Sequence, residues 1–560
     1  MYNGFSKYIV HNKHSEKLIT NIKQDAEEYI GKPINALNFS RFKIFSETGS
    51  RIEYEADYME HRKRLNVFAI MSMYEDNPVY LKELEDIIWA ICDEFTWILP
   101  AHTYMVHGEK KPENYEEAID LFSAETGVYL SEVLYIVGDR LNKLVKQRVE
   151  YEVKKRITEP YLKYRQCWGK NNWSSVCASA VGMSMIYLRE DEKFKLCSAD
   201  IKKSIDLFLE SYENDGCCKE GSLYWSYGFG FMCYYGRLLR DYTKGEIDVF
   251  QNAKVRSIAE FGQNIFLDKN NTIPFSDAPH ELNFNIGLFT FLSREYGFSI
   301  PDERYECVFG DDIRYRLCDL VRNFYWYDEK YDVREHKLEY YFYQDSMWYI
   351  KKQDLYSFAA KGGNNNEPHN HNDLGGFVLY ADGMFIIDDL GWQEYDGNYF
   401  DERYRYRDYI CASSAGHSVP IINMQYQTYG EDRYTTVDEV DEKSITYDLS
   451  RAYVGCGRIK RQFEFKDNGI QINDCYNQQV TTIIERFVTR IEPQIDKNIV
   501  KIGCWKMWCP NIEDINISTE VFKPRNTIVK SSMKSIETAY LIDFIIKKCP
   551  KNVNIYLEKN

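Results

Sequence analysis

The chain has 560 residues, of which 44% are hydrophobic and 28% are charged, and this composition excludes an intrinsically disordered protein. Its length predicts roughly two to four domains. The net charge of −16 argues against nucleic acid or an anionic membrane as the main partner, because both repel a strongly acidic protein. Any site for an acidic ligand must therefore be locally basic.

The start of the chain and its cysteines indicate a compartment. Residues 1–18 hold no basic segment followed by an apolar run and a small-residue cleavage site, so we expect no signal peptide. No stretch of about 18 apolar residues occurs, so we expect no membrane span. The 15 cysteines are odd in number and form no CxxC pair, which favours reduced thiols. We therefore expect a cytoplasmic protein. The sequence leaves its oligomeric state open, with a homo-oligomer as one alternative.

Up to about residue 330 the hydrophobic pattern repeats at three- and four-residue steps, which predicts amphipathic helices. Asn77 and Pro78 suit the N-cap and first turn of one such helix, which we expect to end at Pro100. Its apolar face consists of Leu81, Leu84, Ile88, Ile91 and Phe95. Further helices are expected around residues 130–144, 186, 201–209 and 231–239. This pattern predicts paired helices wound into a bundle or toroid.

Two segments of this half do not resemble routine helix. Asn171-Asn172-Trp173 precedes a run of small residues, which predicts a tightly packed helix whose start faces a cleft. Amides and helix-start N–H groups bind carboxylates well, although an ordinary N-cap beside a core Trp is an equal alternative. Residues 214–228 place aromatics between glycine-containing turns, and a tyrosine there either presents its phenol to a groove or packs in the core. His102 lines the groove or has a structural role.

From about residue 339 the period changes to two, which predicts strands. Residues 356–360 form one expected strand. Residues 377–380 and 384–387 form a hairpin around Asp382-Gly383, and a second hairpin turns at Asn468-Gly469. Helices followed by strands predict two layered domains, residues 1–330 and 331–560.

Three of the ten histidines lie between residues 364 and 423. His369 and His371 would point to one face of an extended strand, and the 377–387 hairpin would return Asp388 and Asp389 toward His371. Imidazole and carboxylate are ligands that zinc accepts, and a remaining imidazole can serve as an acid or base. The alternative is a chance pair on a polar strand.

The same region resembles the heparinase II/III-like family of polysaccharide lyases. The resemblance rests on an ordered series of short motifs: His369-Asn370-His371-Asn372-Asp373, Gly375-Gly376-Phe377, Asp382-Gly383, Asp389-Leu390-Gly391 and Ala415-Gly416-His417-Ser418. It implies an α+β multidomain protein with an N-terminal incomplete α/α toroid, a C-terminal antiparallel β-sandwich and an active site between them. It also implies β-elimination on uronic-acid-containing glycans, giving 4,5-unsaturated uronyl products.

The resemblance also implies roles for particular residues. Tyr224 would be the catalytic phenol with Tyr227 in reserve, His369 the second proton carrier, and Asn171 or Asn172 the ligand of the uronate carboxylate. Several relatives have His where this chain has Trp173, which puts the carboxylate-binding set in doubt. The expected substrate-binding residues are Asn171, Trp173, His102, Tyr227 and Glu367, beside the catalytic Tyr224, His369 and Asn172. A structural zinc ion would be held by His371, Asp389 and His417, with Asp388 as the alternative to Asp389.

The expected partner is an acidic oligosaccharide or polysaccharide. Three other functions stay open: an α/α-toroid glycoside hydrolase acting on unsaturated uronides, zinc-activated hydrolysis, and a non-catalytic carbohydrate-binding protein. A hydrolase needs two carboxylates flanking the scissile bond, and no such pair stands out in the helical half. The lack of an export signal favours short imported oligosaccharides and exo action.

Overall fold

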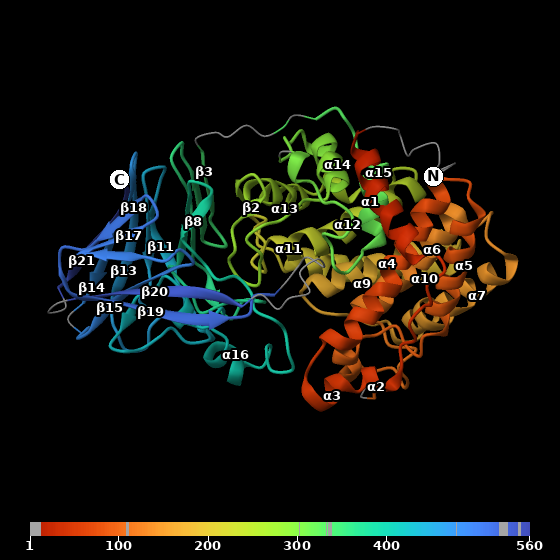
Figure 1. The fold of residues 1–560 in the computed structure, drawn as a ribbon, viewed down its shortest axis with the longest axis horizontal. Coiled ribbons are helices and arrows are strands. Elements are labelled where there is room, and N and C mark those ends of the chain that lie inside the picture. The colour runs from red at the N-terminus through yellow and green to blue at the C-terminus, as the bar shows by residue number, and fades with distance from the viewer. Residues whose placement is uncertain are drawn as a thin grey trace.

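The computed structural model describes residues 13–107, 111–301, 303–331, 333, 339–477, 479–525, 536–546 and 550–560. Helices occupy the N-terminal half and strands the C-terminal half, side by side along the longest axis (Figure 1). This arrangement confirms the predicted order of an incomplete α/α toroid followed by an antiparallel β-sandwich. None of the described helices is long and apolar enough to cross a membrane.

The helical half contains the following helices: α1 (Lys13–Tyr29), α2 (Phe39–Phe42), α3 (Ile44–Thr48), α4 (Ile52–Tyr74), α5 (Pro78–Asp93), α6 (Leu121–Val137), α7 (Lys143–Val153), α8 (Glu159–Tyr164), α9 (Asn172–Tyr187), α10 (Asp191–Glu210), α11 (Ser222–Tyr224), α12 (Gly230–Tyr242), α13 (Ala253–Asn264), α14 (Ile286–Tyr296) and α15 (Leu317–Tyr325). Two short strands, β1 (Phe266–Asp268) and β2 (Asn271–Thr272), pair within this half.

Helix α9 packs against α6, α10 and α12 of the helical half. Its run of small residues allows this close approach on all sides, and almost the whole helix is buried. Helix α5 begins as predicted, since the Asn77 side chain accepts a hydrogen bond from the Val79 N–H. The predicted end was wrong, because α5 stops at Asp93 and Phe95 is 63% exposed beyond it.

The strand half contains β3 (Glu339–Tyr343), β4 (Trp348–Lys352), β5 (Ser357–Lys361), β6 (Asn364–Asn365), β7 (Phe377–Ala381), β8 (Met384–Ile387), β9 (Ile421–Ile422), β10 (Gly430–Tyr434), β11 (Thr436–Val440), β12 (Ser444–Asp448), β13 (Ile459–Lys466), β14 (Gly469–Tyr476), β15 (Ile483–Thr489), β16 (Gln494–Asp496), β17 (Ile499–Ile502), β18 (Trp505–Trp508), β19 (Ile512–Phe522), β20 (Glu537–Ile546) and β21 (Asn552–Lys559), with one helix, α16 (Glu402–Asp408). The main sheets run β11-β12-β13-β14-β21-β18-β17-β16, β3-β4-β5-β7-β8 and β19-β20-β15-β9, all antiparallel.

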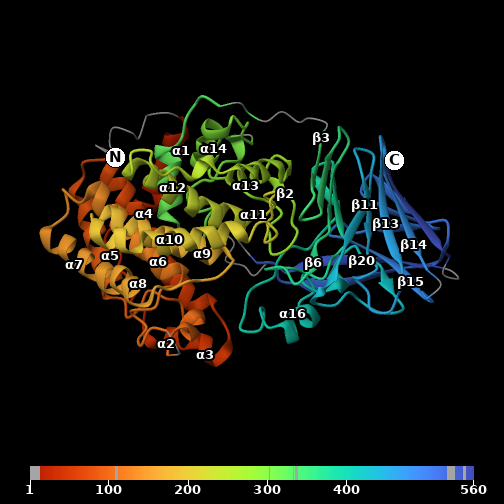
Figure 2. The same cartoon turned by 180° about the vertical axis from the view of Figure 1, so that it is seen from behind.

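The five-stranded sheet β3-β4-β5-β7-β8 is covered on both faces, which explains why β5 and β7 are buried throughout. On one face, Phe358 and Phe377 pack on Phe463 of the eight-stranded sheet with ring centroids 5.1 and 5.0 Å apart. On the other face, Trp348 packs on Phe261 and Phe275 of the helical half. Figure 2 shows this sheet lying between the helices and the outer strands.

Both predicted hairpins form. Strands β7 and β8 pair around Asp382 and Gly383, whose φ angles of 55° and 80° suit a tight turn, and β13 pairs with β14 from Lys466 and Gly469 outward. The predicted extended strand at His369 and His371 was wrong. This segment is irregular, and His369 has a φ of 57°.

Candidate active site

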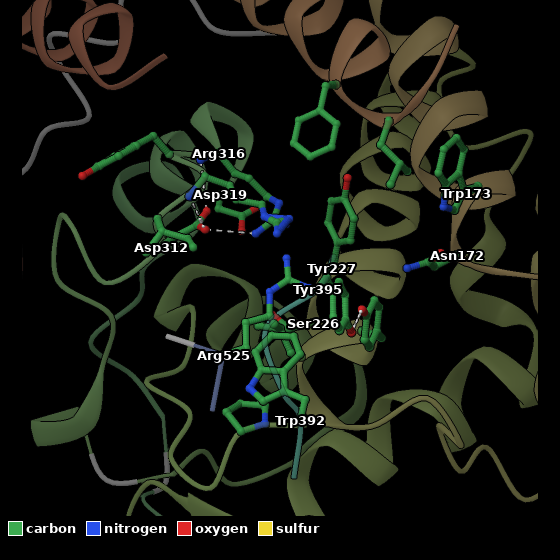
Figure 3. A pocket seen from close by; sticks show the side chains of 18 of the residues that line it. Asn172, Trp173, Ser226, Tyr227, Asp312, Arg316, Asp319, Trp392, Tyr395 and Arg525 are labelled. Atoms are coloured by element: carbon green, nitrogen blue, oxygen red, sulfur yellow. Dashed lines mark hydrogen bonds and ion pairs between the residues drawn. The ribbon is translucent and has the colours of Figure 1, made fainter. Parts of the chain in front are cut away.

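A cavity of about 970 Å³ lies between the two halves of the chain. This volume is at the upper end of the roughly 300–1,000 Å³ typical of ligand sites. The helical half lines it with residues that include His102, Asn172 and Tyr224, and the strand half with residues that include His369 and Tyr395. Figure 3 shows Asn172 pointing toward the cavity from one side, opposite the side that carries Arg316. The structure thus brings together predicted residues that are far apart in sequence.

Tyr224 and His369 meet across this boundary. Their ring centroids are 4.1 Å apart, and the Tyr224 hydroxyl is 2.9 Å from the hydroxyl of Tyr395. Tyr224 ends the short helix α11, directly before a π-helical turn at Trp225–Phe229, a backbone irregularity frequent at functional sites. Burial raises the pKa of Tyr224 to about 12, although the positive charge of Arg525 opposes this rise. The phenol is therefore neutral at physiological pH.

Asp277, which sequence reasoning missed, organises the imidazoles. Its Oδ2 lies 2.7 Å from His369 Nδ1, and its Oδ1 lies 3.1 Å from His371 Nε2. The hydroxyls of Tyr395 and Tyr399 also donate to this carboxylate, at 3.0 and 2.6 Å. A carboxylate only accepts hydrogen bonds, so His369 places a proton on Nδ1 toward Asp277, and its Nε2 is the ring nitrogen that faces away from this carboxylate, 3.8 Å from Glu220 Oε2.

A buried arginine keeps Asp277 charged. Arg405, which is 4% exposed, places Nη2 3.0 Å from Asp277 Oδ1 and 3.1 Å from its Oδ2. Burial alone would raise the pKa of Asp277, but Arg405 and the hydrogen bonds from His369 and His371 hold it well below its usual range. Arg405 lies in α16, within the tyrosine-rich connector to which the sequence assigned no role.

Two glycines allow the Asp277 loop to sit between the halves. Gly221 has a φ of 106°, and a Cβ there would approach the Ala278 Cβ to 2.7 Å. Gly391 has a φ of 65°, and a Cβ there would approach the Ala278 carbonyl oxygen to 2.6 Å. Both positions need glycine for its conformation and for space. The loop therefore packs closely against Gly221 of the helical half and against Gly391 of the strand half.

The start of α9 faces the cavity as predicted, but its two asparagines differ. Asn171 is the N-cap, with its Oδ1 accepting from the Trp173 N–H and its Nδ2 donating to a carbonyl. Asn172 is 5% exposed and points toward the cavity (Figure 3). Trp173 packs edge-on against His102 with ring centroids 4.9 Å apart. The Nδ1 of His102 is held by Asp120 Oδ2 at 2.7 Å, which leaves its Nε2 for other partners.

Two predicted binding residues have other contacts. The ring of Tyr227 lies 3.9 Å from the Arg316 guanidinium carbon, and its hydroxyl bonds Glu125. Burial, and then Glu125, raise the pKa of Tyr227 well above its usual value. Glu367 is absent from the described lining of the cavity and pairs with Lys219 at 3.1 Å, joining the two halves.

A second cluster lies behind the cavity. His371, Asp373, Asp389 and His417 are buried and offer ligand atoms that all lie within 4.8 Å of one another. The predicted ligands therefore converge, and Asp373 is a fourth donor that the predicted set lacked. Asp388 lies outside this cluster and pairs with His280 at 2.7 Å and with Arg490 at 3.0 Å.

The donor atoms of this cluster suit a metal ion. Within the described part of the chain, His371 Nδ1 and Asp373 Oδ2 are buried without a hydrogen-bond partner. The opposite ring nitrogens are occupied, since His371 Nε2 donates to Asp277 and His417 Nε2 donates to the Cys411 carbonyl at 2.8 Å. Metal-binding histidines commonly donate their second N–H in this way. Two imidazoles and two carboxylates form a donor set that zinc accepts.

No protein-family model and no curated protein sequence matches this chain. Several solved structures, in contrast, are similar to this chain. Heparinase III is 12% identical with a TM-score of 0.64, covering 98% of this chain and 92% of its own. A mutant of the heparan sulfate lyase HepC from Pedobacter heparinus is 13% identical with a TM-score of 0.59, covering 100% and 92%. The Streptomyces coelicolor A3 chondroitin AC lyase, in complex with chondroitin sulphate, is 11% identical with a TM-score of 0.58, covering 100% and 80%. The chain therefore has the toroid-and-sandwich fold of these polysaccharide lyases, which the resemblance of its sequence to the heparinase II/III-like family implied.

Proposed function

We propose that this protein is a lyase that cleaves uronic-acid-containing oligosaccharides or polysaccharides by β-elimination. The observation that carries this proposal is the pairing of Tyr224 with His369 inside a cavity formed by both halves of the chain. A phenol and an imidazole in contact supply the two proton-transfer groups that the reaction needs. The lyase activities named for the structurally similar proteins support the same reaction class.

The reaction first requires the uronate carboxylate to be neutralised, because the proton on C5 is otherwise too weakly acidic. Asn172 points toward the cavity, and His102 contributes a ring whose Nδ1 is already bonded to Asp120. Together they bring an amide and an imidazole to the lining of the cavity. Preorganised donors of this kind are typically worth several kcal/mol at a developing negative charge.

His369 acts as the base and Tyr224 as the acid in this proposal. The Nε2 of His369 takes the C5 proton, the C5–H electron pair forms the C4=C5 double bond, and the C4–O4 bond breaks. Tyr224 then gives its proton to O4. We assign the roles in this way because the Tyr224 phenol holds a proton that it can give, and because Asp277 binds His369 through Nδ1, so that Nε2 is the nitrogen with which the neutral imidazole can take a proton.

The 4.1 Å separation of the two rings has a stereochemical consequence. Both groups reach the sugar from one side, so the C5 proton and the C4 oxygen must lie on the same face of the ring. Glucuronate and mannuronate meet this condition, whereas iduronate, galacturonate and guluronate do not. The proposed reaction is therefore a syn elimination.

Product analysis on a panel of these uronates tests the proposal. We expect polymers of glucuronate or mannuronate to give products with new ultraviolet absorbance from the conjugated double bond, and the other three to give little. A glycoside hydrolase would instead give saturated products that incorporate oxygen from water. Saturated products, or no cleavage across the whole panel, would contradict the lyase assignment.

We further propose that His371, Asp373, Asp389 and His417 hold a structural zinc ion. When bound, zinc would supply a fixed positive charge that holds together the loops bearing these four residues. His371 is two residues from His369 and shares Asp277 with it, so the cluster fixes the segment that carries the base.

Metal analysis of the purified protein tests the zinc site. We expect about one zinc ion per chain, and we expect His417→Ala to lose it together with thermal stability, because the variant removes one of four ligands. Asp388→Asn is the matched control for zinc content, which it should keep even if its stability falls, since Asp388 is the neighbouring carboxylate outside the cluster. Equal zinc content in wild type and His417→Ala would exclude the site.

A further inference from the structure

The wall of the cavity carries two arginines that lack a carboxylate partner among the described residues. Arg314 and Arg525 both line the cavity, and neither has a carboxylate oxygen within ion-pair distance in that part of the chain. Other cavity arginines are paired: Arg51 lies 2.5 Å from Glu55, and Arg316 lies 3.1 Å from Asp312. Two unpaired guanidinium groups in one cavity of an acidic protein need an explanation.

The two arginines come from different halves of the chain and are held by aromatic rings. The Arg525 guanidinium carbon lies 3.7 Å from the ring centre of Tyr395 and 4.9 Å from that of Trp392. Figure 3 shows Arg525 directed toward the side of the cavity that carries Arg316. Arg314 lies over Phe122 at 5.7 Å. The close contact with Tyr395 holds the Arg525 guanidinium in place, and contact through a ring face leaves N–H groups free for an oxyanion.

The charges of these residues interact with one another. Burial, and then the positive charges of Arg525 and Arg316, lower the pKa of Arg314. Glu55 is the nearby opposing charge: burial would raise its pKa, but Arg51, Arg314 and Arg525 lower it. The short contact of Glu55 is with Arg51, so its carboxylate does not saturate the other two arginines. An anion bound between Arg314 and Arg525 would relieve their mutual repulsion.

We propose that Arg314 and Arg525 form a second anion subsite, which binds a sulfate ester or carboxylate on a sugar next to the uronate that is cleaved. This inference rests on the proposed function. The uronate carboxylate at the cleaved position is assigned to the Asn172 side of the cavity, so the arginines receive a different charged group. A guanidinium donates two parallel N–H groups to a sulfate or a carboxylate alike.

Binding measurements test this subsite without turnover. In a Tyr224→Phe background, the affinity of a chondroitin 4-sulfate tetrasaccharide and of its unsulfated counterpart is measured by calorimetry. We expect Arg314→Gln and Arg525→Gln each to weaken binding of at least one tetrasaccharide by about tenfold to a hundredfold, the usual scale for a charge-assisted hydrogen bond. A loss confined to the sulfated ligand identifies a sulfate ester, and an equal loss on both ligands identifies the neighbouring carboxylate.

Matched variants distinguish a loss of affinity caused by loss of this subsite from one caused by a general loss of positive charge or by misfolding. Arg407→Gln removes an exposed arginine of α16 that pairs with Asp408 away from the cavity, and should leave both affinities unchanged. Arg525→Lys keeps the charge but not the paired N–H groups, and should recover part of the loss while the melting temperature stays constant. Affinities within twofold of the background in both Gln variants, or the same loss in Arg407→Gln, would overturn the subsite. The absence of lyase products would overturn the proposed function alone.

Discussion

Tyr224→Phe is expected to lower kcat by about 10²–10⁴-fold, the usual contribution of a positioned acid or base, while oligosaccharide affinity stays nearly unchanged. The substitution removes only the hydroxyl, which lies 2.9 Å from Tyr395, and keeps the ring that stacks on His369. Without this proton donor, O4 must leave as an alkoxide. Steady-state kinetics on the preferred polymer, with binding measured separately, checks both parts of the expectation.

Tyr227→Phe is the matched comparison for this prediction. Tyr227 lines the same cavity, but its hydroxyl is bonded to Glu125 and its ring carries Arg316. It should therefore retain far more of kcat than Tyr224→Phe. A Tyr224→Phe enzyme that keeps kcat within tenfold of wild type, or a larger loss in Tyr227→Phe, would remove Tyr224 from the proposed mechanism.

Asp277→Asn is expected to reduce kcat by about 10²-fold or more and to lower the melting temperature. An amide can donate as well as accept, so it no longer fixes the proton of His369 on Nδ1, and Nε2 loses its role as base. The variant also leaves Arg405 buried without its carboxylate, and breaking a buried ion pair typically costs about 3–5 kcal/mol. Kinetics and thermal unfolding on the same preparation measure the two effects.

Asp388→Asn is the control that separates two causes of a fall in kcat: loss of the Asp277 contact that orients His369, and loss of stability. Asp388 is also buried, and it joins His280 of the helical half to Arg490 of the strand half. We expect a comparable fall in melting temperature with a much smaller fall in kcat, because His369 keeps its partner. If both variants lose kcat in proportion to their loss of stability, Asp277 has a structural role only.

Local chemistry made much of the fold predictable from sequence. The Asn77 cap, the Asp382-Gly383 turn and the Asn468-Gly469 turn each depend on residues within four positions of one another, and each forms as predicted. The change from helical to two-residue periodicity marked the order of the two halves. The predicted boundary at residue 330 falls between α15 and β3.

Contacts between distant residues were not predictable in this way. Asp277 lies 92 residues from His369 and 128 from Arg405, in a loop with no periodic pattern. The prolines on either side of Asp277 are typical of any turn, and the sequence does not show the positive φ of Ser276. The two histidines share Asp277 as a partner through an irregular backbone, so they converge as the His-x-His spacing predicted, although the predicted extended strand was wrong. Asp373 belongs to the motif that begins at His369, but the resemblance implied only His371, Asp389 and His417 as ligands; in the structure Asp373 joins them and also pairs with Lys361 at 2.7 Å.

Because Ala278 packs between Gly221 of the helical half and Gly391 of the strand half, the proposed proton transfer depends on the two halves being docked together. Tyr224 and Asp277 belong to the helical half and His369 to the strand half, so neither half alone holds all three groups of the proposed mechanism. A measurement of the proposed activity would therefore also report whether the two halves are docked. A molecule that separates the two halves would break the contact between Asp277 and His369, and would abolish the proposed activity without competing for the sugar-binding groups.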